Sequence, residues 1–157
     1  MPFFARSTNG APTGSDPDEK AAMDFLSEVD RDNTARMKRL VEDLGWPLRC
    51  EVGPECSMNA WLLVQHADHD LGFQRRCLDL MRAAPQGEVD PANIAYLCDR
   101  VRLAEGQAQL YGTQVERVDG IFRPCSLADP EDVDKRRLAA GLEPLADYLS
   151  SFGKLGL

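Results

Sequence analysis

The stretch that decides the fold is Trp61–Leu80, WLLVQHADHDLGFQRRCLDL, which contains both histidines of the chain. At about 100° per residue, its apolar residues fall on two opposite sides of a helix, and the charged residues collect on a narrow edge between them. We therefore expect one central helix from Trp61 to about Ala84, weakened at Gly72 because glycine is a poor helix former. A helix with two apolar faces belongs in the middle of a helical bundle.

The composition limits the class of protein. The chain has 157 residues, 43% of them hydrophobic, which is enough for one domain with a core. Its formal net charge of -8 argues against nucleic acid as a partner, because binding to phosphates needs a basic surface. No apolar run approaches the roughly 20 residues that span a bilayer, so no membrane partner is expected either.

The five cysteines are odd in number and form no C-x-x-C pair, which is neither a disulfide framework nor a zinc pattern. We expect reduced thiols, with Cys77 and Cys98 buried as small hydrophobic side chains. The opening segment lacks the apolar core of a secretory signal, so a cytoplasmic, bacterial-type protein is expected. Because no glycine-rich phosphate loop or dinucleotide fingerprint occurs, we expect no cofactor.

The N-terminal part divides into a tail and a first helix. Residues 1–16 are rich in Gly, Pro, Ser, Thr and Asn, which predicts a disordered tail before a single mainly helical domain over residues 17–157. Asp16-Pro17 is typical of a helix start, and Gly45 with Pro47 of a helix end. A connection over residues 48–55 follows. The apolar stripe of this first helix consists of Phe25, Val29, Met37, Leu40, Val41 and Leu44.

The remaining elements are marked by caps and turns. Asp90-Pro91 predicts a helix that ends at Gly106, and Asp129-Pro130 predicts another that ends at Gly141, before a last turn or two from Pro144. Between these helices, β-branched and aromatic residues surround Asp119-Gly120, which predicts an antiparallel hairpin over residues 109–123. The expected fold class is mainly α, a helical bundle with a small antiparallel β-hairpin.

Five blocks of sequence resemble an uncharacterised bacterial family of unknown function over residues 24–149. They are Gly45-Trp46-Pro47, residues 61–68 (WLLVQHAD), residues 99–101 (DRV), residues 109–114 (QLYGTQ), and Asp129-Pro130 followed by Val133-Asp134 and Arg136-Arg137. The resemblance implies a whole-domain match but no reaction, and His69 lies outside the family's block. The polar positions that it implies to be shared are Gln65, His66, Asp68, Asp99, Arg100, Gln109, Tyr111, Thr113, Gln114 and Arg137.

The same polar residues suggest a site on chemical grounds. On an extended strand alternate side chains share a face, so Gln109, Tyr111 and Thr113 would present an amide, a phenol and a hydroxyl along one edge. The imidazole of His66 titrates near neutral pH and is suited to act as a general acid or base, with Asp99 or Gln114 to orient it. We expect the central helix and the hairpin to form two walls of one site. The candidate catalytic residues are His66, Asp99 and Tyr111, and the candidate substrate-binding residues are Gln65, Asp68, Arg100, Gln109, Thr113, Gln114 and Arg137.

Two classes of function stay open. The first is a small enzyme in which His66 performs acid–base chemistry, a hydrolysis, elimination or cyclisation, on a small polar substrate. The second is a non-catalytic module that binds a small molecule or a protein, in which the same side chains form a buried polar network. The sequence does not indicate the substrate, the reaction or the oligomeric state.

Two of the polar groups also have alternative interpretations. Asp99-Arg100 could bind a substrate carboxylate or orient an imidazole. Alternatively, it forms an interhelical salt bridge. His66, His69 and Asp70 are spaced i, i+3 and i+4, so on one helix they would approach one another as metal ligands. Such a site would still need a fourth ligand, and no metalloprotein signature is present, so no metal is expected.

Overall fold

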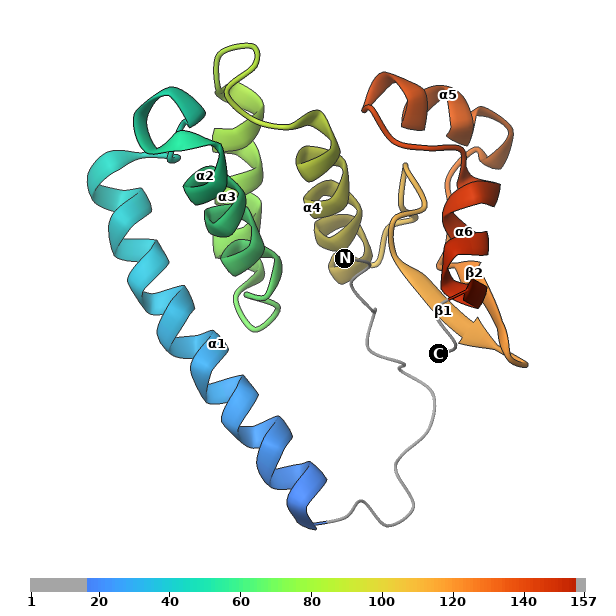
Figure 1. Ribbon diagram of the computed structural model, residues 1–157, viewed down its shortest axis with the longest axis horizontal. Coiled ribbons are helices and arrows are strands. Elements are labelled where there is room, and N and C mark those ends of the chain that lie inside the picture. Colours follow the sequence, from blue (N-terminus) through green and yellow to red (C-terminus); the bar gives the residue numbers. More distant parts are fainter. Residues whose placement is uncertain (1–16, 155–157) are drawn as a thin grey trace. The chain divides into compact units, whose positions relative to one another are not determined.

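A computed structural model of the chain describes residues 17–154, and these contain six α-helices, one short 3-10 helix and one two-stranded antiparallel sheet (Figure 1). The predicted fold class, mainly α with a small hairpin, is therefore confirmed. The described residues divide into two compact units, one up to Val89 and one from Asp90 onward. The single domain stays a prediction, and the predicted tail over residues 1–16 lies outside the described residues.

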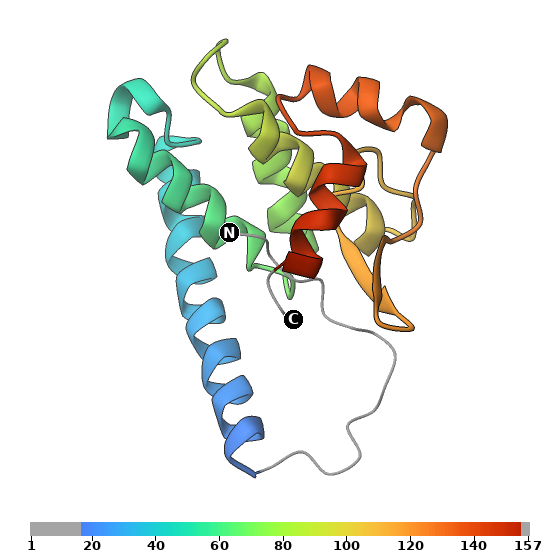
Figure 2. The same cartoon turned by 45° about the vertical axis from the view of Figure 1, so that its right-hand side comes forward.

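The N-terminal unit consists of three helices: α1 (Pro17–Leu44), α2 (Arg49–Gln65) and α3 (Leu71–Ala83). Helix α2 runs antiparallel to α1, and α3 reverses direction again, as both views show (Figures 1 and 2). Helix α1 ends where predicted, because Gly45 takes a positive φ of 82° that favours glycine. The buried core of this unit includes Met37, Val41, Trp46, Ala60, Trp61, Val64, Phe73, Cys77, Leu78 and Met81.

The prediction of one central helix from Trp61 to Ala84 is wrong. Helix α2 ends at Gln65, and α3 begins only at Leu71. The Asp70 side chain accepts a hydrogen bond from the backbone N–H of Phe73 at 3.0 Å, which is the geometry of an N-cap. A new helix therefore starts inside the periodic stretch.

Helix α2 also begins earlier than expected. Residues 49–55 were predicted to lie in a connection, yet they belong to α2, which starts at Arg49. Gly53 interrupts the helix with a φ of 81° and a ψ of 161°, directly before Pro54. The Gly-Pro pair therefore marks a kink rather than a loop, because proline is well tolerated at the start of the resumed helix.

The C-terminal unit contains α4 (Pro91–Ala104), β1 (Val115–Val118), β2 (Ile121–Pro124), the 3-10 helix η1 (Pro130–Asp132), α5 (Val133–Ala139) and α6 (Leu145–Lys154). As predicted, Asp90 caps α4 by accepting a hydrogen bond from the Ala92 N–H at 2.9 Å. Helix α6 packs against β2, and Tyr148 and Phe152 of α6 form a buried hydrophobic cluster with Val115 of β1. None of the helices in residues 17–154 is long and apolar enough to cross a membrane.

The hairpin is shorter than predicted. Its turn is confirmed, since Asp119 and Gly120 both have positive φ angles, 51° and 79°, and Val118 pairs with Ile121. However, β1 begins at Val115, so Gln109, Tyr111 and Thr113 do not lie on a strand. The predicted ladder of side chains along one strand edge is wrong, because this segment is an irregular loop.

Candidate functional site

The site residues predicted from the sequence are distributed over both units. Gln65, His66 and Asp68 lie in the N-terminal unit, at the turn between α2 and α3. The other seven lie in the C-terminal unit, on α4, on α5 and in the loop before β1: Asp99, Arg100, Gln109, Tyr111, Thr113, Gln114 and Arg137. That the two groups line one site stays a prediction.

His66 is exposed, whereas the sequence placed it on an apolar face of a buried helix. The reason is that α2 ends at Gln65, so His66 is the residue that closes the helix, its backbone N–H donating to the Leu62 carbonyl at 3.2 Å. His69 is exposed in the same turn, and Asp70 caps α3. The alternative metal site required these three side chains to lie on one helix. They lie between two helices instead, because α2 ends at Gln65 and α3 begins at Leu71.

The turn is held by Gln74, a residue that sequence reasoning missed. Its fully buried side chain donates through Nε2 to the Val64 carbonyl at 3.1 Å and lies 3.2 Å from Oδ1 of Asp68. The Gln65 side chain is also buried, and its Nε2 has no hydrogen-bond partner among the described residues. A glutamine between Phe73 and Arg75 carries no sequence signal that distinguishes it from a surface residue.

Asp99 is the centre of a buried network in the C-terminal unit. Its Oδ1 accepts hydrogen bonds from the backbone N–H groups of Leu110 and Tyr111, at 2.7 and 3.1 Å. Its Oδ2 accepts from the N–H and the hydroxyl of Thr113, both at 3.0 Å. Burial raises the pKa of Asp99, and these hydrogen bonds act in the opposite direction. Both oxygens are occupied by the loop that the carboxyl group organises.

The side chain of Gln109 forms hydrogen bonds to backbone groups of the same loop and of Cys125. Its Nε2 donates to the carbonyls of Gln114 and Cys125, both at 2.9 Å, and its Oε1 accepts from the Gln114 N–H at 3.0 Å. The Gln114 side chain donates in turn to the Thr113 hydroxyl at 3.1 Å. All three side chains are buried. The predicted substrate-binding residues of this segment therefore bond to one another and to backbone.

Arg137 reaches the loop from α5, and it is almost fully buried. Its Nε donates to the Glu143 carbonyl at 2.6 Å, and its Nη1 donates to the Tyr111 carbonyl at 2.7 Å. The guanidinium lies 4.9 Å from the centre of the Tyr148 ring, within cation–π range. The Tyr148 hydroxyl donates to the Thr113 carbonyl at 2.8 Å. Arg100, on α4 next to Asp99, is partly buried.

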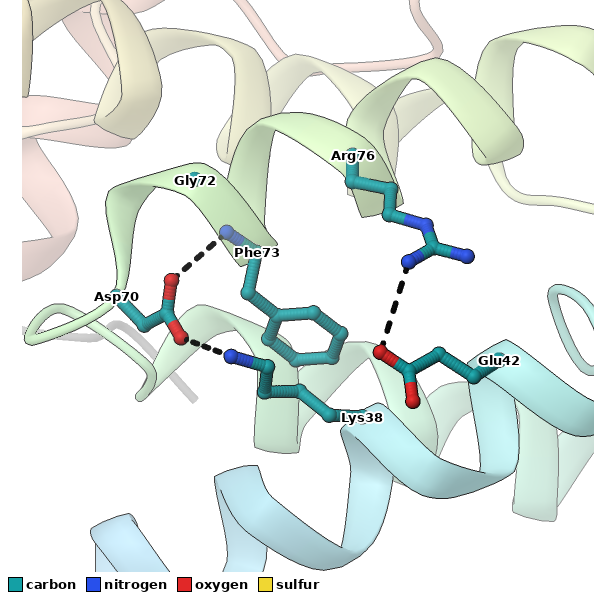
Figure 3. A pocket seen from close by; sticks show the side chains of 6 residues that line it. All are labelled: Lys38, Glu42, Asp70, Gly72, Phe73 and Arg76. Atoms are coloured by element: carbon teal, nitrogen blue, oxygen red, sulfur yellow. Dashed lines mark hydrogen bonds and ion pairs between the residues drawn. The ribbon is translucent and has the colours of Figure 1, made fainter.

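A polar pocket of about 260 Å³ lies between α1 and α3, and the sequence did not predict it. Lys38 and Glu42 come from α1, while Asp70 caps α3 and Gly72, Phe73 and Arg76 come from its first turns (Figure 3). The Phe73 ring lies between two ion pairs of this pocket. The residues that form each pair are far apart in sequence, which is why no local motif marks the pocket.

The two ion pairs differ in tightness. Lys38 Nζ lies 2.7 Å from Asp70 Oδ2, a short charge-assisted hydrogen bond that lowers the pKa of Asp70 and raises the pKa of Lys38. Arg76 Nη1 lies 3.7 Å from Glu42 Oε1, and both of these side chains are more than half exposed. The first pair is within hydrogen-bond distance, and the second leaves its hydrogen-bonding groups accessible.

The described residues contain no group of three His, Cys, Asp or Glu side chains that could hold a metal ion. All five cysteines are free, and Cys77 and Cys98 are buried as predicted. Burial raises the pKa of Cys77 to about 12, so its thiol is protonated at neutral pH.

The chain was compared with known protein families. A family of unknown function, DUF6624, matches residues 8–154 of the chain. The chain belongs to the DUF6624 family. The resemblance stated from the sequence is thereby confirmed at the level of the family, whereas the bacterial origin stays a prediction. No curated protein and no solved structure matches the chain. Because the function of DUF6624 is unknown, membership of the family assigns no activity to the chain.

Proposed function

We propose that the chain is a non-catalytic binding module for a small zwitterion of the amino-acid type. The ligand sits in the pocket between α1 and α3, where its carboxylate pairs with Arg76 and its ammonium group pairs with Glu42. The observation that carries the proposal is the loose Arg76–Glu42 pair, 3.7 Å apart, in a pocket that is also lined by the tighter Lys38–Asp70 pair.

The loose pair supports a ligand with both charges. An exposed ion pair of this kind contributes about 0.2–1 kcal/mol, so separating it costs little. A guanidinium offers a planar fork of donors that matches a carboxylate, and Glu42 offers two acceptor oxygens to an ammonium group. A zwitterion replaces both halves of the pair, whereas an anion or a cation alone leaves one side chain without its partner.

The rest of the pocket supports a ligand of small size. Lys38 and Asp70 pair with each other at 2.7 Å, and the Phe73 ring supplies an apolar surface beside them. Gly72 has no side chain to fill the space at the start of α3. A volume of about 260 Å³ is slightly below the range of about 300–1,000 Å³ that is typical of small-molecule sites, which restricts the ligand to a small one.

The C-terminal network supports a binding module over an enzyme. A catalytic acid or base needs a lone pair or proton that a substrate can reach. The oxygens of Asp99 face three backbone N–H groups and one hydroxyl of their own loop. Histidine-based acid–base chemistry stays a prediction that requires His66 to act together with this network. The five free cysteines support a cytoplasmic location as part of the proposal.

The proposal is tested by isothermal titration of the full chain with the proteinogenic L-amino acids, one at a time. For an amino acid that binds, the corresponding amine without the carboxylate and the corresponding acid without the amino group are titrated as matched ligands. We expect each of them to bind at least about tenfold more weakly. Arg76→Gln and Glu42→Gln should weaken binding by a similar factor, whereas Arg123→Gln, an exposed arginine on β2, should leave it unchanged.

Two results would contradict the proposal. The first is that no L-amino acid binds the natural chain. The second is that binding occurs but survives both Arg76→Gln and Glu42→Gln, which would place the ligand elsewhere. Circular dichroism establishes that each variant is folded, and Arg76→Lys, which keeps the charge but loses the fork of donors, should retain part of the affinity.

A further inference from the structure

The two ion pairs of the pocket between α1 and α3 lie at successive turns of α1. Lys38 and Glu42 are four residues apart on this helix, so they share one side of it and lie about 6 Å apart along its axis. Lys38 pairs with Asp70 and Glu42 pairs with Arg76, and the Phe73 ring lies between the two pairs (Figure 3). A ligand bound at the Arg76–Glu42 pair therefore has a second pair of charges within reach of its own side chain.

The Lys38–Asp70 pair keeps hydrogen-bonding groups for a ligand. An ammonium group has three N–H donors, and a carboxylate has about four lone-pair positions. Among residues 17–154, Lys38 donates to Oδ2 of Asp70 at 2.7 Å, and Oδ1 of Asp70 accepts from the Phe73 N–H at 3.0 Å. The two side chains are 43% and 28% exposed. A ligand group that both donates and accepts can therefore bridge the pair without separating it.

We propose that the Lys38–Asp70 pair makes the pocket selective for L-glutamine, which rests on the proposed function. A carboxamide is neutral and carries a carbonyl acceptor beside an N–H₂ donor, so its oxygen accepts from Lys38 while its nitrogen donates to Asp70. The two methylene groups of the ligand cross the Phe73 ring between the ion pairs. Its ammonium group and its carboxylate stay on Glu42 and Arg76, as for any zwitterion in this pocket.

Charge and hydrogen bonding disfavour the other side chains of similar length. The carboxylate of glutamate is attracted by Lys38 but repelled by Asp70, and the ammonium group of ornithine meets the opposite combination. The thioether of methionine has no N–H or O–H donor, so it covers the two charges without satisfying them. Asparagine carries the right group on a side chain that is one methylene shorter, too short to span the helical turn between the two pairs.

Isothermal titration of the full chain with five amino acids tests the selectivity: L-glutamine, L-methionine, L-glutamate, L-ornithine and L-asparagine. The first four have side chains that reach equally far from the α-carbon, so their comparison isolates the terminal group. We expect L-glutamine to bind at least about tenfold more tightly than each of the others, because only its side chain makes both hydrogen bonds to the charged pair.

Two variants should change the preferred ligand rather than abolish binding. Lys38→Met leaves the Asp70 carboxylate without its cation, so the affinity for ornithine relative to glutamine should rise at least about tenfold. Asp70→Asn keeps an N-cap for α3 but removes the negative charge, so the relative affinity for glutamate should rise by a similar factor. Lys20→Met removes an exposed cation of α1 outside the pocket and should leave the order of affinities unchanged.

The possible results separate the selectivity from the proposed function. If an amino acid binds and Arg76→Gln weakens its binding, but glutamine has no advantage over methionine, the selectivity is overturned and the zwitterion site stands. If glutamine is preferred but neither Lys38→Met nor Asp70→Asn changes the order of ligands, the pair does not make the selection and the proposal is overturned too. If none of the five binds, the selectivity is overturned, and titration of the remaining L-amino acids decides the proposed function. Circular dichroism verifies that each variant keeps its helical content.

Discussion

The two units use their polar side chains in opposite ways. In the C-terminal unit, the carboxyl group of Asp99, the amide of Gln109 and the guanidinium of Arg137 are buried and bond to backbone groups of one loop. In the N-terminal unit, Arg76 and Glu42 stand more than half exposed at the rim of a pocket, 3.7 Å apart. The first arrangement determines the shape of a loop, and the second leaves groups that a ligand can reach.

This difference shows that a cluster of polar residues in the sequence does not by itself indicate a binding site. A segment without regular secondary structure must satisfy its buried backbone groups with side chains. Residues 109–114 do so with Asp99, Gln109 and Arg137, which gives the segment the polar composition expected of an active site. A residue that binds a ligand must instead keep part of its hydrogen-bonding capacity unused.

The largest effect on stability is expected from Asp99→Asn, which tests whether the C-terminal network holds its loop. The change replaces one carboxylate oxygen of Asp99 by an amide N–H₂ group. The N–H groups of the loop that donate to this oxygen then lose their acceptor. We expect a loss of about 3 kcal/mol in the free energy of unfolding. Urea unfolding measures it, and Asp147→Asn, the same change at an exposed position of α6, is the control. An equal, small effect of both changes would mean that the Asp99 network does not hold the loop.

A smaller loss is expected from Gly112→Ala in the same loop. Gly112 has a φ of 67°, and an added Cβ would lie 2.9 Å from Cδ1 of Leu145. Positive φ costs alanine about 1–2 kcal/mol, and the close contact adds to this. Gly106→Ala is the control, because its φ is 75° but nothing lies within 4 Å of the added atom. Equal losses in the two variants would show that the loop is free to move away from α6.

The smallest effect is expected from Asp70→Ala in the N-terminal unit, and it depends on pH. The hydrogen bond from Lys38, with that from the Phe73 N–H, holds the pKa of Asp70 below its usual 3.8. The contribution of the ionised carboxylate is therefore present above pH 3.8 and lost as the pH falls through the lower, folded-state pKa. At neutral pH the loss of the N-cap should cost about 1 kcal/mol. Unfolding curves measured across the acid range check this, and a pH-independent difference would contradict it.

Caps and turn residues in the sequence predicted those helix ends and turns that depend only on neighbouring residues. Asp90-Pro91 caps α4, Asp119-Gly120 makes the hairpin turn, and Gly45 ends α1, all as expected. The break between α2 and α3 could not be predicted, because buried Ala67 continues the apolar periodicity through the turn. Asp70 caps the new helix while it pairs with Lys38, which is 32 positions away in sequence.

The site was harder to predict than the fold. The resemblance correctly indicated the family, and the polar residues of the 109–114 segment do cluster, yet their partners are mostly backbone groups that a sequence does not reveal. His66 was misplaced because its burial depended on a helix that ends one residue earlier. The pocket of Lys38, Glu42 and Arg76 joins two helices and has no local motif.

The central claim is that the ligand binds in the N-terminal pocket and not at the C-terminal network. Its most direct test is to record backbone amide chemical shifts of the full chain while an L-amino acid that binds is titrated. We predict that the largest changes occur at Gly72, Phe73 and Arg76, with the amides of residues 109–114 unaffected. Changes concentrated at residues 109–114 or at His66 would contradict the account and favour the catalytic site predicted from the sequence.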